Sequence, residues 1–151
     1  MRRRGRDIIL FLLQNMPNGA LKTQLVKLLF LVDLKAKERL GRTLTGFTYR
    51  LYLYGPYSPE IEDVLREMEL NGDISILGRI SFSGNRYVVY FAERDEEIQI
   101  CDDEKEIIKD VLKEYGDKPL EELLDDVYAL EIVKKHSFGE VVLSNGREGA
   151  A

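Results

Sequence analysis

Apolar residues recur at helical spacing in two stretches of the first third of the chain. The first stretch predicts a short helix that begins after a capping Asp7 and ends before Pro17. The second stretch has the strongest periodicity in the sequence, with apolar residues at Leu21, Leu25, Leu28, Leu29, Val32, Ala36 and Leu40. Gly41 is expected to end this second helix. Because residues 25–34 are apolar nearly all round, we expect this helix at the centre of the fold.

Alternating apolar positions replace the helical spacing over residues 44–54 and predict an extended segment. The side expected to face the core consists of Phe47, Tyr49, Leu51 and Leu53. The opposite side, which then needs another partner, consists of Arg50, Tyr52 and Tyr54. The Gly-Pro pair at 55–56 predicts a turn, and Ser58 is expected to cap a helix over residues 59–70.

The second half of the chain predicts a β-hairpin followed by two helices. Two runs with strand alternation, 74–77 and 86–91, flank a Gly-Asn turn, and whether residues 80–82 belong to the first arm stays open. A further helix is expected to begin at a cap of Asp102 or Asp103, and a last helix near Pro119.

The order of these elements is typical of a winged helix-turn-helix unit: helix, long helix, extended segment, helix, hairpin. We therefore predict an α+β, mostly helical fold, with a winged helix-turn-helix-like core, a β-hairpin and two additional C-terminal helices. We expect a basic flexible N-terminus at 1–6, a single domain at 7–143 and a flexible tail at 144–151.

The composition is that of a soluble globular protein, with 44% hydrophobic and 32% charged residues and 4 prolines in 151 residues. These values exclude a disordered, collagen-like or membrane chain. The single Cys101 cannot form an internal disulfide, which favours a reducing, cytoplasmic location. The apolar run at 8–13 is too short for a membrane span or a signal peptide. Low Asn, Gln and His beside abundant Glu, Lys and Arg favour a thermophilic source.

Charge is distributed unevenly along the chain, whose net charge is -5. The first 50 residues contain 11 Lys and Arg against 3 Asp and Glu, whereas the remaining residues contain 11 against 24. The basic third suits an anion or an acidic partner, and the acidic remainder should repel nucleic acid. A solvated surface whose charges merely segregate is the open alternative.

The helix predicted over 59–70 tests the DNA-binding interpretation of the fold. Its exposed positions hold five acids and one base, namely Glu60, Glu62, Asp63, Arg66, Glu67 and Glu69. Phosphates would repel such a helix in the major groove, so this docking mode is disfavoured. Nucleic-acid contact would then fall to arginines of the hairpin and of an N-terminal arm, namely Arg79, Arg86, Arg2, Arg3 and Arg4. Ordinary solvated arginines are the alternative for these positions.

Residues that commonly carry catalysis are sparse. His136 is the only histidine, which excludes multi-histidine metal sites and most histidine-based catalysis. Cys101 precedes two aspartates, whose charge disfavours a thiolate nucleophile. Carboxylates at helical spacing near Asp125 and Asp126 would suit Mg²⁺ only with a facing third ligand. We expect no catalytic site, no cofactor and no metal.

Tyrosines cluster around the predicted turn. Tyr49, Tyr52, Tyr54 and Tyr57 fall within nine residues and are half of the tyrosines in the chain. Tyrosine presents a large apolar face and a hydroxyl group at low entropic cost, which suits protein interfaces. The alternative is a folded turn whose rings cover the core.

Several motifs are similar to those of the SocA/Panacea family of phage-associated antitoxin domains, over about residues 8–135. The helix segment Lys-Leu-Leu-Phe-Leu-Val-Asp at 27–33 resembles that family's "KLLYLAD". The other matching segments are Leu-Thr-Gly at 44–46, Tyr-Gly-Pro-Tyr-Ser-Pro at 54–59, Gly72, and the stretch at 115–123. The resemblance implies a small helical domain without known catalysis. Its members commonly neutralise a toxin by binding it, and one delivers its toxin to a protease. It also implies that Lys27 and Asp33 support the turn from the long helix.

We therefore predict a non-enzymatic protein-binding module of antitoxin or proteolytic-adaptor type that sequesters a toxin-like partner. Its partner-binding residues are predicted to be Arg50, Tyr52, Tyr54 and Tyr57. The main alternative is a winged-helix DNA-binding transcriptional regulator, and a third hypothesis is a metal-dependent nuclease that uses the acidic pair at 125–126. No membrane contact is expected, and a monomer and a homodimer both stay open.

Overall fold

The computed structural model describes residues 2–145, with side chains from residue 4 onward, and this part of the chain contains six helices and six strands. The helices are α1 (Arg2–Gln14), α2 (Lys22–Leu40), α3 (Pro59–Leu70), α4 (Asp102–Tyr115), α5 (Leu120–Tyr128) and α6 (Glu131–Lys134). The strands are β1 (Ala20–Leu21), β2 (Tyr49–Tyr52), β3 (Gly55–Tyr57), β4 (Ile74–Ile80), β5 (Arg86–Ala92) and β6 (Val141–Leu143). The predicted mixture of helices and strands is confirmed. None of the described helices has both the length and the apolar character of a membrane span.

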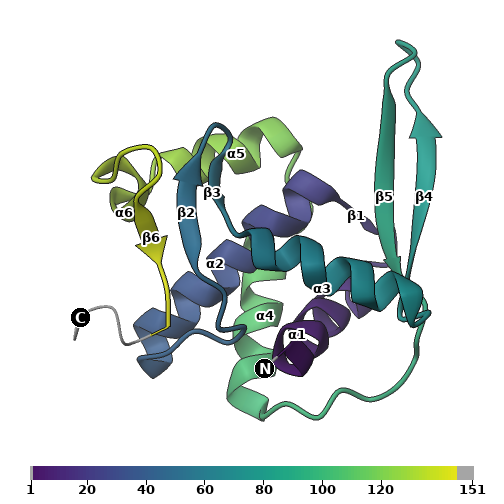
Figure 1. Cartoon of the computed structure of the whole chain (residues 1–151), viewed down its shortest axis with the longest axis horizontal. Coiled ribbons are helices and arrows are strands. Elements are labelled where there is room, and N and C mark those ends of the chain that lie inside the picture. Colours follow the sequence, from purple (N-terminus) through teal and green to yellow (C-terminus); the bar gives the residue numbers. More distant parts are fainter. Residues whose placement is uncertain (1, 146–151) are drawn as a thin grey trace.

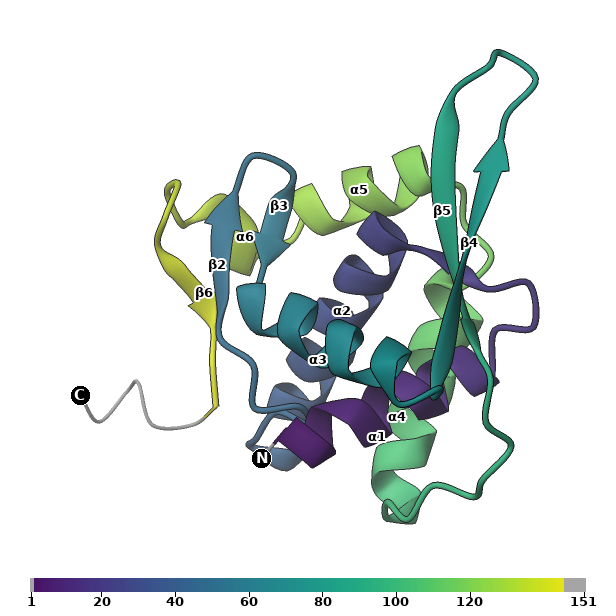
Figure 2. The same ribbon diagram turned by 45° about the vertical axis from the view of Figure 1, so that its right-hand side comes forward.

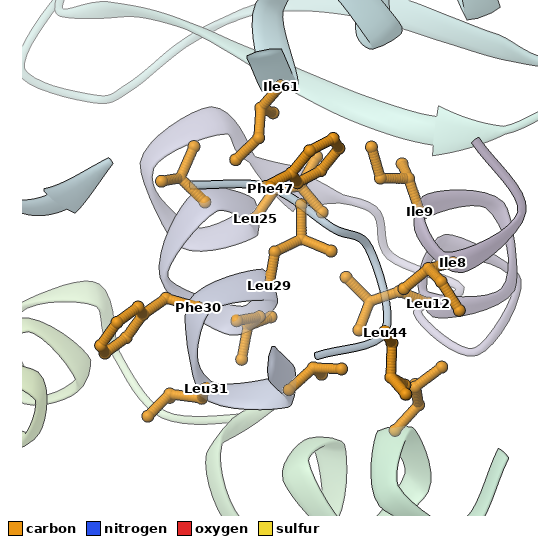
Figure 3. Close-up of a cluster of buried hydrophobic side chains, with 14 of the residues drawn as sticks. Ile8, Ile9, Leu12, Leu25, Leu29, Phe30, Leu31, Leu44, Phe47 and Ile61 are labelled. Carbon is orange, nitrogen blue, oxygen red and sulfur yellow. The ribbon is translucent and has the colours of Figure 1, made fainter. Parts of the chain in front are cut away.

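Helix α2 is the central helix, as its apolar surface predicts. Every residue from 25 to 33 is buried, and the helix ends at Gly41, whose φ is 77°. In Figure 3, Leu29 lies on the side of α2 that faces Ile8 and Leu12 of α1, whereas Phe30 lies on the opposite side. The helix also packs against α4, α5 and β3.

Helix α1 begins at Arg2, so the prediction that Asp7 caps this helix is wrong. Of the segment expected to be flexible at 1–6, residues 2–6 are helical, and residue 1 lies outside the described residues. The first turns are held by partners distant in sequence. Arg4 forms an ion pair with Glu104 and donates a hydrogen bond to the carbonyl oxygen of Leu44, and Arg6 binds Asp73. These contacts compensate the charges of Arg4 and Arg6 and hold the first turns of α1 against the fold.

The predicted hairpin is confirmed, and it belongs to a three-stranded antiparallel sheet of order β1-β5-β4. Its strands pair from Ile74 opposite Ala92 to Ile80 opposite Arg86, so the first arm continues past residue 77 to Ile80, the first residue of the segment 80–82 that was left open for it. Figure 1 shows the hairpin extending away from the helices. The two-residue strand β1, which pairs with β5, was not predicted.

A second antiparallel sheet has the order β3-β2-β6 and lies beside α5 (Figure 2). The turn that joins β2 to β3 is formed by Leu53 and Tyr54, because Tyr52 pairs with Gly55. The predicted turn at Gly55 and Pro56 is therefore wrong, and both residues lie in β3. Leu53 was expected to face the core, but the turn leaves it 77% exposed.

Asp33 of α2 holds the loop that leads into β2. Its carboxylate accepts hydrogen bonds from the backbone N–H groups of Leu44 and Thr45, from Thr45 Oγ1 and from Tyr49 Oη, at 2.6–3.1 Å. Burial raises the pKa of Asp33, and these four hydrogen bonds oppose that rise. Asp33 therefore supports the turn after the long helix, as the family resemblance implies.

The C-terminal elements differ from prediction at their ends. Cys101 occupies the N-cap of α4, and the Glu104 side chain accepts a hydrogen bond from its N–H, so neither Asp102 nor Asp103 is the cap. Helix α5 begins directly after Pro119, as predicted. The short elements α6 and β6 were not predicted.

The predicted tail at 144–151 is only partly described. Within it, Ser144 O accepts a hydrogen bond from Lys37, and Asn145 Oδ1 accepts one from the N–H of Thr43. These two residues are therefore in contact with the fold, and residues 146–151 lie outside the described part of the chain.

Candidate functional site

Four aromatic side chains, Tyr52, Tyr54, Tyr57 and Phe138, line a cavity of about 610 Å³. The cavity is lined by the first turns of α2, the β2–β3 hairpin, Glu62 of α3 and Phe138 of the loop before β6. Its volume lies within the range of roughly 300–1,000 Å³ that ligand pockets in proteins have. It is therefore the candidate site.

The β2–β3 turn positions the aromatic side chains. Gly55 has a φ of 99°, a backbone conformation that only glycine adopts without strain, and it brings the chain back against Tyr52. Tyr128 of α5 donates a hydrogen bond of 2.9 Å from its hydroxyl group to the carbonyl oxygen of Leu53. Helix α5 thereby fixes the turn while Leu53 and Tyr54 stay exposed.

Three rings form an edge-to-face cluster in the wall of the cavity. The ring centroid of Tyr52 lies 5.7 Å from that of Tyr57 and 6.0 Å from that of Phe138. Such pairs favour one relative orientation of the two rings. Tyr54 and Phe138 are 72% and 66% exposed. Large exposed apolar side chains that gather in this way are typical of a protein interface.

A hydrogen-bonded group lies on the α3 side of the cavity. The hydroxyl group of Tyr57 donates a hydrogen bond of 2.6 Å to Glu62, and Lys22 forms an ion pair with the same carboxylate. Burial and the contact with Glu62 raise the pKa of Tyr57. Burial alone would raise the pKa of Glu62, but the hydrogen bonds from Lys22 and Tyr57 lower it below its ordinary value. The carboxylate of Glu62 is therefore ionised and compensated.

Lys27 lines the same cavity from within α2. Its side chain is almost completely buried, and its Nζ donates a hydrogen bond of 2.9 Å to the carbonyl oxygen of Pro56. No carboxylate of the described residues forms an ion pair with it, and burial lowers the pKa of Lys27 to about 8. At neutral pH this side chain is still mostly a buried ammonium ion.

Of the four residues predicted to bind a partner, the structure brings three together. Tyr52, Tyr54 and Tyr57 all line the cavity. Arg50 does not line it, and its guanidinium group donates a hydrogen bond of 3.0 Å to the carbonyl oxygen of Gly139. Tyr49, the fourth tyrosine of the cluster, is fully buried in the core.

Sequence reasoning missed Phe138, and it assigned Lys27 only a structural role. Phe138 is isolated in the sequence between polar residues, so no local pattern marks it. Lys27 did carry a signal, because it lies within the mostly apolar stretch 25–34, which is expected to be buried nearly all round.

The arginines predicted for nucleic-acid contact are dispersed over the fold. Arg79 and Arg86 are exposed on the hairpin, and the Arg79 guanidinium lies 6.0 Å from the ring centroid of Phe91. Arg4 forms an ion pair with Glu104 and is not part of a free arm. The side chains of Arg2 and Arg3 lie outside the described part of the structure.

The acids of α3 are engaged to different extents. Glu60 accepts hydrogen bonds from the N–H of Thr48 and from Ser58 Oγ. Ser58 is the N-cap residue of α3, as predicted, but its hydroxyl group forms no capping hydrogen bond. Glu62 is compensated by Lys22, and Asp63 pairs with Arg66 of its own helix. The exposed surface of α3 is still acidic.

The other candidate chemical groups form no site among the described residues. No cluster of three His, Cys, Asp or Glu side chains that could hold a metal ion occurs there. Asp126 pairs with Lys118. The Nδ1 atom of His136 lies 2.6 Å from the carbonyl oxygen of Ile132, and Cys101 is exposed at the start of α4.

Comparison with known proteins found one family. A family model described as "Antitoxin SocA-like, Panacea domain" matches residues 25–131. No curated protein and no solved structure matches the chain. The matched range contains the cavity lining except for Lys22, Thr23 and Phe138.

Proposed function

Because the chain belongs to the family of antitoxin SocA-like Panacea domains, we propose that it is a protein-binding module of antitoxin type that sequesters a toxin-like partner. The observation that carries this proposal is the exposed aromatic cavity, in which Tyr54, Leu53 and Phe138 present apolar surface beside the edge-to-face pair of Tyr52 and Tyr57. Central, well-packed aromatic side chains supply most of the binding free energy in protein interfaces. We assign the partner-binding surface to this cavity and exclude Arg50 from its lining.

The module is proposed to act without catalysis. The only histidine contacts a backbone carbonyl oxygen, and the single cysteine lies at the start of a helix beside two aspartates. Neither side chain lines the cavity, which supports a binding role for it.

The arrangement of α1, β1, α2, α3 and the β4–β5 hairpin supports a winged-helix relationship, because β1 pairs with the second hairpin strand. A winged helix commonly binds DNA, and Arg79 and Arg86 lie on the hairpin without an acidic residue between 74 and 92. The acidic surface of α3, however, would face the phosphates in the usual docking mode. We therefore propose a winged-helix-like domain that binds protein.

The test uses the product of the reading frame adjacent to this gene, purified separately, as the partner. Tyr54→Ala should weaken its binding by at least about tenfold, since truncating a hot-spot tyrosine costs about 2 kcal/mol or more and tenfold corresponds to about 1.4 kcal/mol. Tyr87→Ala, on the hairpin and 41% exposed, is the matched control and should leave the affinity unchanged. Circular dichroism checks that both variants fold. Equal affinity of the Tyr54 variant and the unchanged protein would remove the cavity from the interface.

A second arm tests the DNA alternative. Retardation of the gene's own promoter fragment, weakening steeply with salt and lost in Arg79→Ala/Arg86→Ala, would favour the regulator. We expect no such retardation at physiological salt.

A further inference from the structure

The cavity contains a buried positive charge with no counter-charge. Lys27 is only 2% exposed, and its one hydrogen-bond partner among the described residues is the carbonyl oxygen of Pro56. An ammonium group has three N–H donors, so two of them are not used by the described residues. A buried charge without an ion pair is unfavourable, and it strongly favours the arrival of an anion.

The other charges of the cavity compensate each other. Lys22 pairs with Glu62, whose carboxylate also accepts the hydrogen bond from Tyr57. The remaining lining is formed by aromatic and aliphatic side chains, the Thr23 hydroxyl group and the backbone at Gly55. The excess charge of the lining is therefore the single positive charge of Lys27.

The lining extends from solvent to this charge. Tyr54 and Leu53 are mostly exposed, Tyr52 and Tyr57 are half-buried, and Lys27 is buried beside Gly55. A ligand that enters from the exposed side chains towards the buried lysine places apolar groups against the rings and its innermost group next to the ammonium. The complementary ligand is an apolar group that ends in a carboxylate.

We propose that the cavity binds the C-terminal end of the partner polypeptide, with the terminal carboxylate paired to Lys27 and an apolar last side chain packed against Tyr52 and Tyr57. This assignment rests on the proposed protein-binding function and names the part of the partner that enters the cavity. It also explains why an ammonium ion is placed inside a mostly apolar lining.

A chain end fits the cavity better than an acidic side chain within a chain. An internal Asp or Glu would bring backbone on both of its sides, and each buried N–H and C=O group needs a hydrogen-bond partner. The mostly apolar lining offers few such partners. A chain end brings backbone on one side only, and its carboxylate accepts the free ammonium donors.

The experiment titrates the full chain with three acetylated tripeptides and follows backbone amide resonances by NMR. The probes are Ala-Ala-Phe with a free C-terminal carboxylate, the same peptide as its C-terminal amide, and Ala-Glu-Phe amide, which carries an internal carboxylate. The free acid should shift the resonances of Lys27, Gly55 and Tyr57, and it should bind at least about tenfold more tightly than either amide. In Lys27→Met this preference should disappear, whereas Lys113→Met, on the exposed face of α4, should keep it.

Each other outcome overturns the proposal in a distinct way. Equal binding of acid and amide would show an apolar cavity that does not recognise charge, and the proposed protein-binding function would stand. Tighter binding of the Ala-Glu-Phe amide would replace the chain end by an internal acid. Shifts confined to other elements, or no shifts at millimolar peptide, would remove the ligand from the cavity. The acid-against-amide comparison needs only the unchanged protein, so it holds even if Lys27→Met does not fold.

Discussion

The Nζ atom of Lys27 donates a hydrogen bond of 2.9 Å to the carbonyl oxygen of Pro56, which joins the central helix α2 to β3 at the edge of its sheet. The bond satisfies a buried carbonyl group of the Gly-Pro segment and at the same time fixes the ammonium in the cavity. One side chain therefore supports the β2–β3 hairpin and supplies the charge of the proposed binding site.

The burial of Lys27 predicts a specific pH dependence of stability. Its pKa is lowered from 10.5 to about 8 on folding, so the unfolded chain binds a proton more strongly between these values. Stability therefore rises with pH through this range, and it is lost as the pH falls back towards 8. Relative to Lys27→Met, the unchanged protein should gain about 2 kcal/mol in free energy of unfolding between pH 8 and pH 10.

Urea denaturation of both proteins at several pH values from 7 to 10 measures this difference. Tyr57, Glu62 and Lys22 line the same cavity in both proteins, so their titration largely cancels. Parallel stability curves over this range would show that the lysine is not buried as an ammonium ion.

The carboxylate of Asp33 is expected to be the most sensitive polar group of the fold. Asp33→Ala would leave four buried donors from Leu44, Thr45 and Tyr49 without an acceptor, which should lower the free energy of unfolding by about 3–5 kcal/mol. Asp33→Asn keeps one acceptor oxygen, and the two hydroxyl groups can rotate to accept from its amide. We expect a loss of about 1–2 kcal/mol for this variant.

Tyr49→Phe is the matched control for the Asp33 series. It removes one of the four hydrogen bonds and keeps the ring against Phe30, so a loss of about 1 kcal/mol is expected. Thermal or urea unfolding ranks the three variants. If Asp33→Ala were no more destabilised than Tyr49→Phe, the other hydrogen bonds would contribute nothing.

The elements that the sequence predicted are those whose signals are local. The apolar periodicity of α2, the Ser-Pro start of α3 and the turn residues of the hairpin each lie within one segment. By contrast, α1 begins five residues before the predicted cap at Asp7, because the partners of Arg4 and Arg6 lie 100 and 67 residues away. The short strands β1 and β6 exist only through pairing with distant strands, so no window of sequence could reveal them.

The same distinction holds for the candidate site. Tyr52, Tyr54 and Tyr57 are close in sequence, and their clustering predicted them together; their role in binding stays a prediction. Phe138 reaches Tyr52 from a loop 86 residues later. The place of Lys27 depends on the return of β3 against α2, which is tertiary structure. The turn at Leu53 was missed because Gly55 acts in β3 through its positive φ, and not as a turn residue.

The carboxylate of Asp73 is expected to make the free energy of unfolding fall at acidic pH. Burial would raise its pKa, but hydrogen bonds from Arg6 and Arg94 lower it below its ordinary value. Because the folded pKa lies below the unfolded one, Asp73 contributes stability above about pH 4 that is lost as the pH falls. Asp73→Asn should lower the free energy of unfolding by about 1–3 kcal/mol at pH 7. The free energy of unfolding of this variant should also fall less steeply with decreasing pH below about pH 5.

The control for this prediction is Asp95→Asn, an exposed acid in the loop after β5. It should leave nearly unchanged both the free energy of unfolding at pH 7 and its decrease at acidic pH. Chemical denaturation from pH 3 to pH 7 gives the comparison. If the free energy of unfolding fell equally with decreasing pH in Asp73→Asn and in the unchanged protein, the role of the Arg6–Asp73 pair in joining α1 to the start of β4 would be contradicted.

The backbone conformation of Gly55 is expected to link the stability of the β2–β3 hairpin to partner binding at the cavity. An alanine there would have to adopt a φ of 99°, and its Cβ would lie 3.4 Å from Lys27 Cε. The strained backbone should lower the free energy of unfolding by about 1–3 kcal/mol. Any relaxation would move the Leu53–Tyr54 turn and the carbonyl oxygen of Pro56 together, so partner affinity should fall as well.

Gly78→Ala separates this effect from the general consequence of replacing a glycine. Gly78 lies in β4, its φ is not positive, and an added Cβ would meet nothing within 4 Å. Its replacement should leave the stability unchanged or raise it slightly, because alanine restricts the unfolded chain. Unfolding and partner-binding measurements on both variants decide the question. If Gly55→Ala lost stability but kept full affinity, the geometry of the turn would be dispensable, and recognition would depend on side chains outside the β2–β3 hairpin.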